Sequence, residues 1–112
     1  MAARDGGSVK RARRTDEARL DAVVHGRVQG LGFRYFVEAL AASRGIVGWV
    51  ANDANGTVRC VAEGPRLALE QLLGDLWEGP FGARVDDVRA TWSVASGTFP
   101  RFEIRSGGHL GD

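Results

Sequence analysis

The chain has too few cysteines and histidines to build a disulfide or a metal centre. Cys60 is its single cysteine, and His25 and His109 lie far from it and from each other in the sequence. One cysteine cannot form an internal disulfide, and zinc sites usually place two ligands within a few residues of each other. We therefore expect no metal site, and we expect Cys60 to be a small buried hydrophobic residue.

Long apolar runs are also missing. No stretch approaches the roughly 18 apolar residues of a membrane-spanning helix, and the N-terminus lacks the apolar core of a signal peptide. These absences predict a cytoplasmic protein that has no contact with a membrane.

The chain has no large excess of charge of either sign. Its formal net charge is +1; residues 1–18 hold five basic and three acidic side chains, which leaves ten basic and eleven acidic for the rest. A nucleic-acid module normally carries a basic face on its folded body, so nucleic acid is not an expected partner. Because residues 1–18 also lack periodic apolar residues, they predict a disordered basic tail.

Hydrophobic periodicity predicts one domain of mixed helices and strands. The 112 residues are 44% hydrophobic and include three Trp and five Phe, enough for one core. Leu20, Ala22 and Val24 alternate with polar residues as in a half-buried strand. The elements expected in this half are a strand from Arg19, a helix over 33–44 with Gly45 as C-cap, a strand over 46–52, an Asn-Gly turn at 54–56 and a strand over 57–63.

The second half of the chain adds a helix and two strands. Gly64-Pro65 is expected to open the helix with proline at its first position, and Gly79-Pro80 to end it. A strand follows over 85–93, with a bulge expected where the alternation breaks at Asp86-Asp87 and with Ala90 facing inward. A short strand over 102–104 and a flexible tail over 106–112 complete the expected elements.

The order β-α-β-β-α-β with a short final strand predicts an α+β fold. It is the order of a ferredoxin-like sandwich, in which two helices cover one face of a mainly antiparallel sheet. In the third strand, Val58, Cys60 and Ala62 are expected to face the core. The alternating residues Thr57, Arg59 and Glu63 are expected to face water.

Three glycines separate the first strand from the first helix. Gly26, Gly30 and Gly32 can adopt positive φ and turn several N–H groups inward, and the helix N-terminus adds its partial positive charge. Arg34 adds a planar fork of donors suited to phosphate. The segment lacks the Lys-Ser or Lys-Thr of a P-loop, and Tyr35 replaces the third glycine of a dinucleotide loop. The pattern therefore fits an anion cradle or a flexible connector whose arginine is only solvated.

Two separated stretches together resemble the acylphosphatase family. They are Val24-His25-Gly26-Arg27-Val28-Gln29-Gly30-Leu31-Gly32-Phe33-Arg34 and Gly48-Trp49-Val50-Ala51-Asn52. The resemblance continues to about residue 105 and implies a ferredoxin-like, acylphosphatase-like domain over residues 19–105.

The resemblance also implies an activity. It is the hydrolysis of an acyl phosphate to a carboxylate and inorganic phosphate by a monomer that needs no cofactor. By resemblance, Arg34 binds the phosphate and Asn52 holds the attacking water. Such a substrate has a good leaving group, so a charged cradle and a positioned water suffice. The implied phosphate-binding loop consists of Gln29, Gly30, Leu31, Gly32, Phe33 and Arg34.

Several residues have other interpretations. Gln29 could cap the loop, and Asn52 could be a turn residue beside the hairpin. Ala51 stands where relatives often carry Arg or Lys. Compared with those relatives, this chain lacks one positive charge near the expected entrance of the active site. A module that binds acyl phosphates without hydrolysing them would not need Asn52. An RNA-binding sandwich would show aromatic residues on its third strand, where this chain has none.

Overall fold

The computed structural model describes residues 16–106 of the chain. The tails predicted at either terminus lie outside this range over residues 1–15 and 107–112. No helix within the described range is long and apolar enough to cross a membrane. The elements are β1 (Glu17–Arg27), α2 (Phe33–Ser43), β2 (Val47–Asn52), β3 (Val58–Pro65), α3 (Arg66–Glu78), β4 (Arg84–Ser93) and β5 (Phe102–Arg105).

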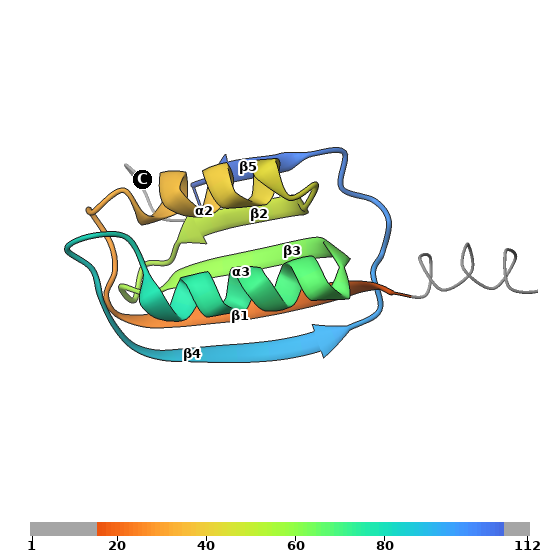
Figure 1. Cartoon of the computed structure of the whole chain (residues 1–112). Helices are drawn as coiled ribbons and strands as arrows, with labels where there is room; N and C mark the ends of the chain where they lie inside the picture. Colours follow the sequence, from red (N-terminus) through yellow and green to blue (C-terminus); the bar gives the residue numbers. More distant parts are fainter. Residues whose placement is uncertain (1–15, 107–112) are drawn as a thin grey trace, which may run out of the picture.

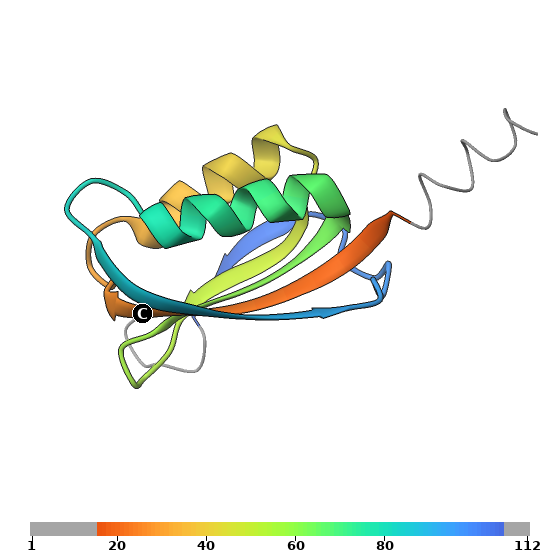
Figure 2. The same ribbon diagram turned by 60° about the horizontal axis from the view of Figure 1, so that its bottom comes forward.

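The five strands form one sheet in the order β4-β1-β3-β2-β5. Neighbouring strands are antiparallel except for β2 and β5, which run parallel. Figure 1 and Figure 2 show both helices on the same face of this sheet. The predicted ferredoxin-like sandwich is therefore confirmed, with a sheet that is mixed at one edge.

The hydrophobic core lies between the sheet and the two helices. Each helix buries residues that lie about one turn apart along one face, and β1 buries every second residue. Fully burying a leucine side chain contributes about 1.5–3 kcal/mol. The buried residues of these elements include Phe33, Val37 and Ala41 of α2, Leu69, Leu72 and Leu76 of α3, and Leu20, Ala22 and Val24 of β1.

Cys60 lies inside this core with 0% of its surface exposed, which confirms its prediction as a buried residue. Burial, with the negative charge of Asp21, raises the pKa of its thiol from 9.0 to about 12. Because the thiolate is the reactive form, we expect a disulfide reagent such as DTNB to leave the folded protein unmodified at about pH 8. One thiol per chain should react after unfolding in denaturant. Rapid labelling of the folded protein would contradict this burial.

The strand β1 begins two residues before the predicted Arg19. Glu17 and Ala18 pair with Pro65 and Gly64 of β3, so both residues belong to the sheet and not to a tail. Pro65 consequently ends β3 and is the N-cap of α3, whereas the sequence pattern placed it at the first helical position. The pairing of distant strands, which local patterns do not contain, sets both boundaries.

The first helix also ends one residue early. Arg44 is the C-cap of α2, and Gly45, the predicted cap, follows it with a φ of 68°. The Nη1 atom of Arg44 lies 2.7 Å from Oδ2 of Asp75, which ties the end of α2 to α3.

The bulge predicted in β4 is confirmed. His25 pairs with Asp87 and Gly26 pairs with Val85, so Asp86 has no partner residue in β1. Gly26 has a φ of 133°, and a Cβ there would overlap the backbone carbonyl oxygen of Arg84. Gly26 thus has the positive φ that was predicted, but it is a strand residue at a bulge and does not lie in the connection between β1 and α2.

The strand β4 forms one edge of the sheet, and this changes its burial. Val88 is buried as predicted, but Ala90, which was predicted to face inward, is exposed. Trp92 is partly buried, and the guanidinium of Arg66 in α3 lies 3.7 Å from the centroid of its ring. An edge strand has a neighbour on one side only, so its short side chains are covered less well.

Glu63 was predicted to face water but is 2% exposed. The connection from β4 to β5 folds over it: the N–H groups of Ser96 and Gly97 each donate to its carboxylate at 2.9 Å, and Ser96 Oγ donates at 2.8 Å. Arg19 Nη1 lies 3.6 Å away. Burial raises the pKa of Glu63, but the hydrogen bonds and Arg19 lower it further, so the pKa lies below its ordinary value of 4.5.

Glu63→Gln should lower the free energy of unfolding at neutral pH by about 1–3 kcal/mol, because an amide cannot accept all three hydrogen bonds. The carboxylate stabilises the folded protein above its ordinary pKa, and this contribution is lost as the pH falls through the lower folded-state pKa. Wild-type stability should thus fall more than that of the variant below about pH 4.5. Urea unfolding over a pH series measures both effects, and parallel curves would contradict the prediction.

Candidate active site

A loop over residues 28–32 joins β1 to α2 at one end of the molecule (Figure 1). Both ends of the loop are anchored in the core, because Val28 and Phe33 are only 1% and 2% exposed. Gly30 and Gly32 between them have φ values of 76° and 77°, and a Cβ at either position would meet no atom within 4 Å. These glycines are therefore needed for their positive φ and not for lack of space. Backbone turns with positive φ can direct several N–H groups toward one point.

The loop runs directly into the N-terminus of α2. Gly32 is the N-cap, and no side chain caps this helix end. Its first backbone hydrogen bond runs from Phe36 N to Gly32 O at 3.0 Å, so the N–H groups of the first turn lie outside the helical ladder. Arg34 is half-buried in the same turn. The arrangement combines backbone donors, a helix dipole and a guanidinium, and it is suited to an anion.

Asn52 is the last residue of β2 and is 7% exposed. Because side chains alternate along a strand, Asn52 shares with the buried Val50 the face that the helices cover. The helix α2 runs away from the loop and β2 returns beneath it, so β2 ends beside loop 28–32 (Figure 1). Arg34 and Asn52 therefore lie at the same end of the molecule.

The side chain of Gln29 joins the loop to the turn that follows Asn52. Its Nε2 donates to the backbone carbonyl oxygens of Asp53 at 2.7 Å and of Thr57 at 2.9 Å. Both partners are acceptors, so the amide nitrogen has to face them. The Gln29 side chain thus makes a structural contact, while its backbone remains part of the loop.

The turn between β2 and β3 is the Asn-Gly hairpin that the sequence predicts. Asn55 Oδ1 accepts hydrogen bonds from Thr57 N at 3.1 Å and from Thr57 Oγ1 at 2.7 Å, and Gly56 has a φ of 94°. Thr57 was expected to face water, but it is only 6% exposed. Asp53 and Thr57 could not be predicted from the sequence as partners of Gln29, because they accept through backbone carbonyl oxygens, which every residue type has.

Ala51 lies on the other face of the sheet from Asn52. Its neighbours are Arg59 of β3 and Arg105 of β5, whose guanidinium groups lie 5.7 and 5.2 Å from the centroid of the Trp49 ring. Ala51 is 0% exposed between them. A side chain at this position points away from the cradle, so the prediction that Ala51 removes a charge at the entrance is not supported.

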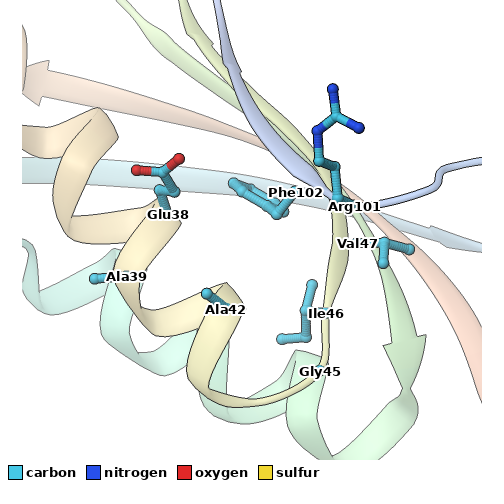
Figure 3. Close-up of a pocket in the computed structure, with 8 residues that line it drawn as sticks. All are labelled: Glu38, Ala39, Ala42, Gly45, Ile46, Val47, Arg101 and Phe102. Carbon is cyan, nitrogen blue, oxygen red and sulfur yellow. The ribbon is translucent and has the colours of Figure 1, made fainter.

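The described residues also form a groove of about 400 Å³ between α2, the α2–β2 turn and the start of β5. Figure 3 shows its apolar residues, with Ala42, Ile46 and Phe102 among them, and the charged side chains of Glu38 and Arg101. None of the predicted site residues lines it, so the groove is separate from the cradle. Within residues 16–106, no three His, Cys, Asp or Glu side chains gather as metal ligands.

Comparison with known proteins decides the family. The sequence model of the acylphosphatase family matches residues 20–104, which is most of the chain. The chain belongs to the acylphosphatase family. Acylphosphatases of Salinibacter ruber and Mycolicibacterium smegmatis are 46% and 45% identical to it, over 80% and 82% of this chain and 94% of each relative. The resemblance is confirmed, and with it the expectation of an acylphosphatase-type enzyme.

Solved acylphosphatases share the fold. The crystal structure from Bacillus subtilis has a TM-score of 0.76 and 39% identity, over 79% of this chain and 98% of that chain. The structure from Coxiella burnetii has a TM-score of 0.77 and 33% identity, over 83% and 97%. The family match includes both Arg34 and Asn52, so loop 28–32 and the end of β2 belong to the acylphosphatase domain.

Proposed function

We propose that this protein hydrolyses acyl phosphates to a carboxylate and inorganic phosphate. One observation carries the proposal: the glycine loop at the N-terminus of α2 lies beside the end of β2, and Gln29 joins the two. This arrangement brings an anion cradle and a polar strand end to one end of the molecule. All these groups come from one chain, so we propose the monomer as the active unit.

In this proposal, the phosphate lies against the N–H groups of residues 29–34. Arg34 donates from its planar guanidinium to two phosphate oxygens, a geometry that an ammonium group cannot reproduce. Negative charge spreads over the equatorial oxygens in the transition state, and fixed donors stabilise it without reorganising. The cradle therefore acts both in binding and in the chemical step.

The amide of Asn52 holds the attacking water opposite the leaving carboxylate. An amide has both a donor and an acceptor, so it can fix the orientation of a water as well as its position. The water oxygen attacks phosphorus, and the bond from phosphorus to the carboxylate oxygen breaks with its electron pair. A water proton passes to a phosphate oxygen of the substrate itself. Because the departing carboxylate is a weak base, the step requires no acid side chain.

Steady-state turnover of acetyl phosphate, with benzoyl phosphate as a second substrate, tests the proposal. We expect hydrolysis of both, competitive inhibition by inorganic phosphate, and no effect of EDTA, because the proposed groups need no metal. Phosphate binding without turnover would indicate a non-catalytic binding module. Activity that a chelator removes and a divalent ion restores would contradict the metal-free mechanism.

A further inference from the structure

The Gln29 side chain bridges the two parts of the proposed active site. On one side, Gln29 immediately precedes Gly30, the first glycine of the loop with positive φ. On the other side, its acceptor Asp53 immediately follows Asn52. The bridge therefore begins at the first residue of the proposed phosphate cradle and ends one residue from the proposed water ligand.

The bridge ends on a turn that has its own backbone hydrogen bonds. Asp53 O also accepts from Gly56 N at 3.1 Å, and Thr57 O also accepts from Asp53 N at 2.9 Å. A carbonyl oxygen has two lone pairs, and in both residues Gln29 takes the one that the turn leaves. The turn thus keeps its own hydrogen bonds whether or not Gln29 is present.

The groups at both ends of the bridge are held in place. Val28, directly before Gln29, is 1% exposed in the core. At the other end, Asn55 Oδ1 fixes Thr57 through two hydrogen bonds, of which the shorter is 2.7 Å. A side chain that connects two rigid parts sets the distance between them.

We propose that Gln29 is a positioning residue that fixes the distance from the phosphate cradle to Asn52. The inference rests on the proposed function. It adds the expectation that phosphate affinity and turnover can be changed separately. Phosphate affinity depends on the cradle alone, whereas turnover depends on where the cradle holds phosphorus relative to the water on Asn52. Loss of the bridge should therefore reduce kcat and leave phosphate binding nearly unchanged.

The test compares Gln29→Met, which keeps the length of the side chain and removes its donors, with wild type. We expect kcat on acetyl phosphate to fall about 10-fold or more, because a misplacement of about 1 Å can cost on the order of 10²-fold. The phosphate Kd should stay within about twofold. Ser43→Ala is the matched control, since it removes a 2.9 Å side-chain bond to the Leu40 carbonyl at the other end of α2.

A double-mutant cycle separates positioning from a general structural role. If Gln29 acts through Asn52, then Gln29→Met should cost little further kcat in an Asn52→Ala background. Equal losses in both backgrounds, an unchanged kcat, or a phosphate Kd that rises with the loss of kcat would overturn the inference.

Gln29→Glu gives an independent test should Gln29→Met fail to fold, as judged by circular dichroism. An ionised carboxylate cannot donate to two carbonyl oxygens, but a protonated one can donate to one of them. The kcat of Gln29→Glu relative to wild type should therefore rise as the pH falls, and a flat ratio would contradict the bridge. Wild type without acyl phosphatase activity would instead refute the proposed function itself.

Discussion

Asn52→Ala is expected to lower kcat on acetyl phosphate by on the order of 10²-fold or more, the usual cost of losing one preorganised polar contact. Phosphate affinity should change by no more than about twofold, because Arg34 and the loop N–H groups remain. Asn52 ends β2 and pairs with Val58, so alanine keeps the strand. Steady-state kinetics and calorimetric titration with phosphate give the two quantities.

The Asn52 variant also separates an enzyme from a binding module. Loss of phosphate binding together with turnover would make Asn52 a cradle or structural residue. An unchanged kcat would remove it from the mechanism. Circular dichroism confirms that the variant is folded, since Asn52 is only 7% exposed and its replacement alters a buried site.

Arg34→Lys is expected to weaken phosphate binding about tenfold or more and to slow turnover as well. Lysine keeps the charge but loses the planar pair of donors, and a hydrogen bond to a charged group contributes about 1.5–3 kcal/mol. Both effects appear together because the cradle binds the phosphate in the ground state and in the transition state. This pattern differs from that of Asn52→Ala, in which only kcat changes.

Arg66→Lys is the matched control for Arg34→Lys. Arg66 is also an arginine in the first turn of a helix, α3, where it lies over Trp92 and pairs with Glu70 at 3.1 Å. We expect its replacement to leave phosphate binding and kcat unchanged. If Arg34→Lys binds phosphate as tightly as wild type, Arg34 is not part of the cradle.

The elements of the fold follow from local patterns in the sequence, but their ends do not. The alternation of Leu20, Ala22 and Val24 predicts β1, and the leucines at 69, 72 and 76 predict the buried face of α3. That β1 begins at Glu17 depends on pairing with Pro65, which is 48 residues away in the sequence. Strand pairing between distant segments sets such boundaries, so a local pattern cannot contain them.

Burial of the residues on a strand is likewise a long-range property. Glu63 alternates with apolar residues as an exposed strand residue would, yet Ser96 and Gly97 cover it from the β4–β5 connection. In contrast, Ala90 is apolar and its spacing in the strand predicts that it faces inward, but it lies exposed on an edge strand. Residue type and spacing predict the face of a strand, and the neighbouring segments decide whether that face is covered.

The candidate site also combines residues that the sequence singles out with contacts between distant segments that it does not. Arg34 and Asn52 stand in the two stretches that resemble the acylphosphatase family, so the resemblance singles them out from the sequence. The contact of Gln29 with Asp53 and Thr57 spans 24 and 28 residues and uses backbone carbonyl oxygens. Any residue type offers such an acceptor, so only the structure identifies the partners of Gln29.

Hydrolysis of acetyl phosphate in ¹⁸O-labelled water tests the central claim most directly. If the cradle holds phosphorus in line with a water on Asn52, the labelled oxygen enters inorganic phosphate, and the acetate retains its original oxygens. Mass spectrometry of the two products reads the position of the label. One labelled oxygen per phosphate and none in acetate is the predicted result; labelled acetate would show attack at the carbonyl carbon and contradict the account.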